Sequence, residues 1–227
     1  MPKRAPLFYV LPKIGGGGAR GRTFRLLMDE ALALVRRGRI PSVAEVAQSA
    51  GVSRATAYRY FPSRSKLVGA LVAEALAPVR EYVPREGEDG LARLNTLVDK
   101  TYPRFRKYEP HMRAALQLAL EHQSLERAGL LEEEPFRRGQ RREILRLATE
   151  PLRPRLSAAA YERLLMALAV VFGIEPLIIL KDICGANDHQ TEAVVRWMMG
   201  ALVEQALREE RAKTPITRPL PASRATR

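Results

Sequence analysis

Hydrophobic positions in the first third of the chain recur at helical spacing. Between Thr23 and Gly38 the apolar residues are separated by three or four positions, which places them on one face of a helix. Gly38 follows this stripe, and Pro41 separates it from the next periodic segment. We therefore predict an amphipathic helix over 23–38, and its buried face should consist of Phe24, Leu27, Met28, Ala31, Leu34 and Val35.

The next segment, SVAEVAQSAGVSRATAYRY over 42–60, has the pattern of two short helices joined by a turn. Ser42 and Ser53 are residue types that favour the position just before a helix. Gly51 can adopt the left-handed backbone on which a helix stops. The pattern predicts a helix-turn-helix, a motif whose second helix enters the major groove of DNA.

Helical periods continue to the end of the chain, and prolines mark their boundaries. We predict helices over 63–76, 88–107, 110–123, 135–150, 157–182 and 188–212, with Pro103 as a point where the second can kink or split. The last two are apolar on more than one side, so both should be covered on more than one side. Glu175 and Pro176 interrupt the longer apolar run, which excludes a membrane span there. The fold class is all-α, with a three-helix head, a larger helical domain and about nine helices in total.

The charge is concentrated at the two ends of the chain. The whole sequence carries 38 basic and 25 acidic residues, a net charge of +13. Residues 1–66 hold thirteen basic side chains and three acidic ones, and 211–227 hold five basic side chains and no acidic one. The remainder is slightly acidic. A basic head on a nearly neutral scaffold is typical of a protein that binds a polyanion.

Four segments follow from these patterns. Residues 1–20 are predicted to be a flexible basic arm, since their apolar run is short and broken by Pro12, which does not fit a secretory signal. Residues 21–66 form the helix-turn-helix domain, 67–212 the larger helical domain, and 213–227 a disordered basic tail. A single cysteine, Cys184, fits a reducing cytoplasm.

The helix-turn-helix segment resembles the DNA-binding head of the tetracycline-repressor (TetR) family of bacterial regulators. The match runs over roughly 20–76 and rests on the motif residues Gly51, Val52, Ser53, Thr56, Ala57, Tyr58, Tyr60, Phe61, Ser63 and Arg64. Ala57 and Arg64 depart from the family's usual larger aliphatic residue and lysine. The resemblance implies a homodimeric repressor that binds a palindromic operator in double-stranded DNA and is released by a small-molecule effector.

Helical spacing separates the two faces of the second helix. Ala57 and Phe61 face the core, which leaves the opposite face outward. Arg54 and Arg59 on that outward face are the candidates for base contacts, because a guanidinium fork matches O6 and N7 of guanine. Backbone phosphates are the expected partners of the others. The full predicted DNA-binding set is Thr23, Ser42, Val43, Ser53, Arg54, Ala55, Thr56, Tyr58, Arg59, Tyr60 and Arg64.

The larger domain is expected to carry a ligand pocket and the dimer contact. The two C-terminal helices are wider in apolar surface than a one-sided stripe, and in the family this pair forms the dimer. The candidate pocket-lining residues are Tyr102, Phe105, Met112, Leu116, Leu120, Ile144, Leu147, Met166, Val170 and Phe172. A stripe of this kind is also what an ordinary helical core looks like, and that alternative stays open.

Other chemistry finds little support. The arginines at 137, 138, 141, 142 and 146 can bind an anionic effector, but four glutamates close by favour a salt-bridged surface instead. His111, His122 and His189 lack the spacing of metal ligands, and loop composition explains the cluster around Asp182, Cys184, Asp188 and His189 better than a metal does. We expect no enzyme, no cofactor and no metal. The alternative to a ligand-released repressor is a ligand-independent or activating regulator of the same fold.

Overall fold

The structure, a computed structural model, describes residues 18–213 except 81, 137 and 139. The described residues form helices and no strand, so the predicted all-α class is confirmed. In chain order the elements are α1 (Ala19–Arg36), α2 (Val43–Ser49), α3 (Arg54–Tyr60), α4 (Arg64–Ala75), α5 (Ala77–Arg80), α6 (Gly90–Lys107), α7 (Glu109–Ala128), α8 (Gln140–Thr149), the 3₁₀ segment η1 (Glu150–Arg155), α9 (Ala158–Val171), α10 (Ile174–Ile178), the π-helical segment η2 (Ile179–Ile183) and α11 (Asp188–Lys213). The predicted arm and tail, apart from their innermost residues, lie outside this range.

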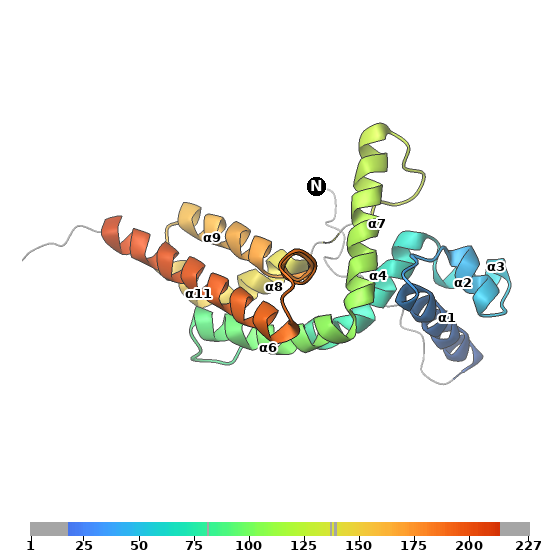
Figure 1. Ribbon diagram of the computed structural model, residues 1–227, viewed down its shortest axis with the longest axis horizontal. Coiled ribbons are helices and arrows are strands. Elements are labelled where there is room, and N and C mark those ends of the chain that lie inside the picture. Colours follow the sequence, from blue (N-terminus) through green and yellow to red (C-terminus); the bar gives the residue numbers. More distant parts are fainter. Residues whose placement is uncertain (1–17, 81, 137, 139, 214–227) are drawn as a thin grey trace, which may run out of the picture.

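The molecule has two unequal parts joined by two helices (Figure 1). The head consists of α1, α2 and α3, and the body contains α6, α8, α9 and α11, of which α11 packs against both α9 and α6. Helix α7 stands between the two parts and packs against α1 and α4. Helix α4 crosses the predicted domain boundary at 66/67, because Leu67 and Leu71 join the head core while Val68 packs against Ala115 and Leu118 of α7.

The head core is built from the residues that the periodicity selected. Leu27, Ala31, Ala47, Ala57 and Phe61 are all completely buried. The Phe61 ring lies 5.5 Å from that of Phe24, centroid to centroid. Helix α1 begins at Ala19 rather than at the predicted Thr23, and no side chain caps it. The glycine run before Ala19 carries no helix-start signal, so the predicted helix began too late.

Side chains and turn residues set the limits of the short helices. Ser42 and Glu45 form a capping box: the Ser42 hydroxyl accepts from the Glu45 N–H (3.1 Å), and the Ser42 N–H donates to the Glu45 carboxylate (2.8 Å). Ser53 and Ser63 cap α3 and α4 in the same way through their hydroxyls. Gly51 has a φ of 64°, the left-handed conformation expected where α2 gives way to the turn.

Three predicted helices of the body differ from those observed. The helix expected over 110–123 extends from Glu109 to Ala128 as α7. The helix expected over 157–182 ends at Val171, bends by 41° and resumes at Ile174. Gly173 lies in the break with a φ of 139°, a backbone that residues with a side chain rarely adopt. The helix expected from residue 135 begins at Gln140. Pro103, by contrast, lies inside α6 without splitting it.

Among the described residues, no single helix combines the length and hydropathy that a bilayer crossing requires. The bent pair formed by α9 with α10 and η2 meets that test only when its two parts are taken together.

Candidate nucleic-acid interface

The outward face of α3 is an exposed polar surface of the head. Ala57 points into the core and is completely buried, which turns Arg54, Tyr58 and Arg59 toward solvent. Tyr58 is 45 % exposed although it is a large aromatic residue. Figure 1 shows α2 and α3 at the end of the molecule farthest from the body. The helix is therefore held by its apolar side and presents its basic side away from the rest of the chain.

The two arginines of α3 are not engaged by acidic side chains of the described residues. Within the part of the chain that the structure describes, neither Arg54 nor Arg59 forms an ion pair. Arg39, in the same head, is paired with Glu45. The pKa of Glu45 is lowered mainly because its carboxylate accepts hydrogen bonds from Ser42, with a smaller contribution from the Arg39 charge. An exposed guanidinium with no carboxylate nearby is available to an external anion or a base edge.

The structure divides the eleven predicted DNA-binding residues into two groups. Arg54, Ala55, Tyr58 and Arg59 are exposed together on α3. The polar side chains of the others already have partners within the protein, and Val43 is 2 % exposed, so it can contribute only its backbone. These internal hydrogen bonds involve Thr23 with the Ala19 carbonyl (3.0 Å), Ser42 with Glu45, Ser53 with Thr56, and the Tyr60 hydroxyl with the Arg20 carbonyl (3.0 Å).

Arg64 is the predicted residue whose surroundings differ most from expectation. Its guanidinium contacts both carboxylate oxygens of Glu121 on α7, at 3.1 and 3.3 Å, and the carbonyl of Ile40 at 3.3 Å. Lys66, which the sequence did not select, lies in the same first turn of α4 and pairs with Glu134 (2.7 Å). The Ser63 N-cap could have indicated this, because it starts the helix whose first turn holds both Arg64 and Lys66.

The predicted pocket residues do not surround one cavity. Tyr102, Phe105, Met112 and Phe172 are buried in the body core, and the ring of Phe105 lies 5.6 Å from Tyr102 and 6.4 Å from Phe172. Ile144 is half-buried at the edge of the same core. Leu147, Met166 and Val170 point outward and are largely exposed. An apolar period alone does not tell an inward face from an outward one, so the sequence could not place these three.

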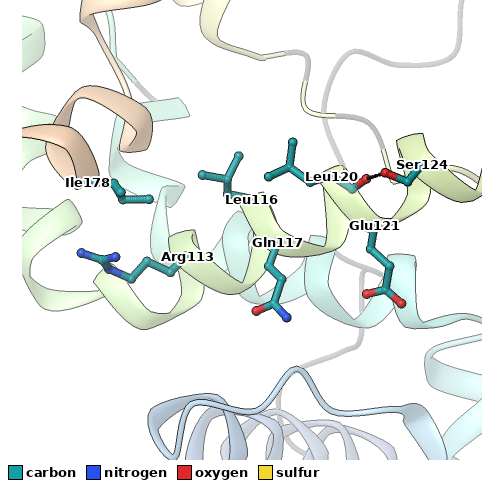
Figure 2. A pocket seen from close by; sticks show the side chains of 7 residues that line it. All are labelled: Arg113, Leu116, Gln117, Leu120, Glu121, Ser124 and Ile178. Atoms are coloured by element: carbon teal, nitrogen blue, oxygen red, sulfur yellow. Dashed lines mark hydrogen bonds between the residues drawn. The ribbon is translucent and has the colours of Figure 1, made fainter. Parts of the chain in front are cut away.

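Leu116 and Leu120 do line a cavity, but it is an open trough along α7. Its volume is about 600 Å³, and its other lining residues are Arg113, Gln117, Glu121, Ser124 and Ile178. Figure 2 shows Leu116 and Leu120 on one side of α7 and Gln117 and Glu121 on the other. Arg113 donates to both carboxylate oxygens of Asp182, at 2.6 and 2.7 Å. This trough therefore combines an apolar strip with charges that are already paired.

Acidic partners surround the arginine cluster of α8, as expected for a salt-bridged surface. Arg141 and Arg138 both pair with Glu175. Burial raises the pKa of Glu175, but these two guanidiniums outweigh burial and hold it below its ordinary value. Arg142 and Arg146 pair with glutamates too, and Arg137 lies outside the described residues. Near the α10–α11 junction Asp182 and Asp188 pair with Arg113 and Lys181, and no cluster of three metal-ligating side chains occurs among residues that the structure describes.

Comparison with known proteins gives three likenesses. Residues 41–71 match the family model described as bacterial regulatory proteins, tetR family. A stretch of 54 residues is 39 % identical to the HTH-type transcriptional repressor LfrR of Mycolicibacterium smegmatis and covers 24 % of this chain and 29 % of that repressor. The crystal structure of a TetR transcriptional regulator from Rhodococcus sp. RHA1 is similar over 82 % of this chain and 97 % of that one, with a TM-score of 0.49 and 19 % identity.

Proposed function

Since this chain belongs to the TetR family of bacterial regulatory proteins, we propose that it is a sequence-specific, DNA-binding transcriptional regulator. In this proposal it acts as a homodimeric repressor in the cytoplasm, binds a palindromic operator and leaves the operator when a small molecule binds the body. The single observation that carries the proposal is the outward face of α3, on which Arg54, Tyr58 and Arg59 are exposed beside a completely buried Ala57.

Base recognition is assigned to Arg54 and Arg59. The major groove admits one helix, and only three or four side chains of such a helix reach base edges. Both arginines lie on the part of α3 that faces away from the head core. Ser53, Thr56, Tyr58 and Tyr60 are assigned to backbone phosphates, which fix the register of the protein on the duplex.

An apolar surface on the body supports the homodimer. Val170 of α9 is 71 % exposed and Trp197 of α11 is 73 % exposed, and the two helices pack side by side. Met166 of α9 and Ile179 and Ile183 of η2 are exposed as well. Large exposed apolar side chains are typical of a protein interface. Two copies related by a twofold axis present two α3 helices to the two halves of a palindrome.

The effector is proposed to bind the body beside α7. The open trough offers apolar contacts from Leu116, Leu120 and Ile178. The buried hydroxyls of Thr101, Tyr102 and Thr191, on the packed helices α6 and α11, have no hydrogen-bond partner among the described residues. Such groups are costly unless a partner satisfies them. None of the three lines the trough, so they point to a second polar site between α6 and α11 rather than to this one.

A ligand-independent or activating regulator is the second candidate. One observation favours it: Tyr102, Phe105, Met112 and Phe172 fill the body core, and each is no more than 5 % exposed. A core packed in this way leaves little room for an enclosed ligand. Shifts in melting temperature across a library of small molecules distinguish the candidates, because a ligand that binds only the folded state raises its stability.

Selection of bound duplexes from a random pool, followed by titration of Arg59→Ala, tests the DNA-binding proposal. We expect the variant to lose about 1–3 kcal/mol of binding free energy for the selected site and to relax base choice at one position. Arg37→Ala removes the same charge from an exposed position of the head outside α3 and should leave base choice unchanged. An equal loss on every sequence would instead assign Arg59 to a phosphate.

Val170→Glu tests the homodimer. A carboxylate on the apolar face proposed for α9 and α11 would be buried twice in a symmetric pair, so we expect at least a tenfold rise in the dimer dissociation constant, or about 1.4 kcal/mol. Val83→Glu is the matched control, since Val83 is 79 % exposed but lies in the segment before α6, outside that face. Sedimentation velocity of both variants gives the answer. A dimer that survives Val170→Glu but not Val83→Glu would show that the interface lies elsewhere on the body.

A further inference from the structure

The first turn of α4 is held by acidic side chains from the body. Arg64 and Lys66 belong to this turn, and their partners Glu121 and Glu134 come from α7 and from the loop that follows it. Glu133, next to Glu134 in the loop, accepts a hydrogen bond from the Ser65 N–H (3.4 Å). We call Glu121, Glu133 and Glu134 the acidic clamp.

The clamp holds Arg64 in a fixed position. Two contacts join the guanidinium to the Glu121 carboxylate, and a third joins it to the Ile40 carbonyl just before α2. The Arg64 side chain is 26 % exposed and that of Glu121 is 40 % exposed. The cation is therefore directed toward α7, while the carboxylate that holds it remains in contact with water.

Buried hydrogen bonds secure the loop that carries the rest of the clamp. The Ser65 hydroxyl donates to the Glu134 carbonyl (2.9 Å), and His122 is 3 % exposed beneath the loop. The His122 Nδ1 accepts from the Phe136 N–H (3.1 Å), and its Nε2 lies 3.2 Å from a Glu133 oxygen. These bonds require Nε2 to carry the hydrogen that faces Glu133. The acidic residues are thus presented to α4 by an ordered support.

Carboxylate and phosphate oxygens compete for the same cations. Arginine and lysine bind both groups through charge-assisted hydrogen bonds of similar length. Exposed ion pairs of this kind are weak, so an outside anion can replace one partner. A DNA backbone running past the first turn of α4 offers such anions at regular intervals.

We propose that the acidic clamp is an autoinhibitory contact that competes with DNA phosphates for Arg64 and Lys66. This inference rests on the proposed function, because it requires that the head bind DNA. Arg54 and Arg59 lie outside the clamp, so it sets the overall affinity for DNA and leaves base choice untouched. Movement of α7 or of its loop then changes the number of cations that the head can offer to a duplex.

Titration of DNA with Glu121→Gln, Glu134→Gln and the double variant tests the clamp. Each single variant should bind the selected site about two- to fivefold more tightly per protomer, the range that a released exposed ion pair provides. The dependence of log K on log salt should steepen by about 0.9 for each freed cation that reaches a phosphate. Glu132→Gln makes the same charge change at an exposed position of the same loop and should alter neither quantity.

A double-mutant cycle separates competition from a general change in structure. In an Arg64→Ala background, Glu121→Gln should give no further gain, because the cation that it frees is absent. Glu134 is 60 % exposed, so Glu134→Gln should fold even if the change at Glu121 disturbs the head. Equal or weaker binding by both glutamine variants, with an unchanged salt slope, overturns the clamp.

The same titrations separate failure of the clamp from failure of the proposed function. Selective binding by the wild type together with unchanged binding by the glutamine variants rejects the clamp and leaves the regulator in place. Selective binding that appears only in the glutamine variants supports both. Absence of sequence preference in every protein rejects both.

Discussion

The head and the body expose opposite kinds of surface. On the head, α3 keeps its apolar side in the core and turns Arg54 and Arg59 outward without an acidic partner among the described residues. On the body, arginines are paired with glutamates along α8, while Val170 and Trp197 remain exposed. Unpaired cations indicate a polyanionic partner, and exposed apolar side chains indicate a protein partner. The uncovered surfaces of the two parts therefore point to different kinds of partner.

Although they expose different surfaces, the head and the body are not independent. Ala114 of α7 belongs to the head core, and Ala115 and Leu118 pack with Val68 of α4. A change in the head core should therefore also alter the packing of α7. The three predictions below test how separate the parts are, beginning with the largest expected effect.

Phe61→Ala should have the largest effect. The ring is completely buried between α1 and α3, and its removal should cost about 3–5 kcal/mol of unfolding free energy. Val83→Ala, at an exposed position in the segment before α6, should change stability by less than about 0.5 kcal/mol. Urea denaturation followed by circular dichroism measures both. Two separate transitions for Phe61→Ala would mean that the head unfolds alone, and one shifted transition would mean that α7 couples it to the body.

Acidification should destabilise the protein through His111, which lies near the start of α7. The pKa of His111 is lowered to about 4, mainly by burial and also by the nearby Arg36 charge, with the Tyr108 carbonyl acting in the opposite direction. Neither ring nitrogen has a partner with good hydrogen-bond geometry among the described residues. Between pH 6.5 and about 4 the unfolded chain binds the extra proton, so the free energy of unfolding should fall by about 3 kcal/mol as the pH drops through this window.

The control for this pH effect is His111→Leu. A leucine of similar volume removes two unsatisfied polar atoms, so stability at pH 7 should be equal or higher. The part of the pH slope that His111 contributes should disappear. Stability measured at several pH values from 7 to 4 decides the matter, and an identical slope in both proteins would rule out His111 as its source.

Ser42→Ala should give the smallest effect of the three. Loss of the capping box on α2 should cost about 1 kcal/mol. Ser157→Ala removes a cap from α9 in the body, where the hydroxyl accepts the Ala160 N–H at 3.4 Å, so its cost should be lower. Melting temperatures of the two variants give the comparison. A larger loss at Ser157 would show that the helices of the head depend less on their caps than the geometry indicates.

The parts of the fold that local chemistry dictates were predictable from the sequence. The turn at Gly51 and the caps at Ser42 and Ser53 each depend on residues within a few positions of one another, and all three occur as expected. The late start assigned to α1 and the break at Gly173 had weak local signals. In the first case the signal was a glycine run with no cap, and in the second a single glycine within an otherwise apolar helix.

The site was predictable only where exposure follows from helical phase. Arg54 and Arg59 face outward because Ala57 and Phe61 face inward, and this spacing is visible in the sequence. The partner of Arg64 lies 57 positions away, so no local pattern indicates Glu121. The exposed positions of Met166 and Val170 were equally hidden, because apolar spacing is the same for a cavity and for an interface.

Arg104 gives α4 a fixed length at its body end. Its Nε donates to the Ala75 carbonyl (2.6 Å) and its Nη2 to that of Glu74 (3.1 Å), while the guanidinium lies 4.5 Å from the centre of the Tyr108 ring. A helix whose final carbonyls are bonded in this way cannot easily gain or lose a turn. In the proposed homodimer, the separation of the two α3 helices would therefore depend on the tilt of α4 rather than on its length.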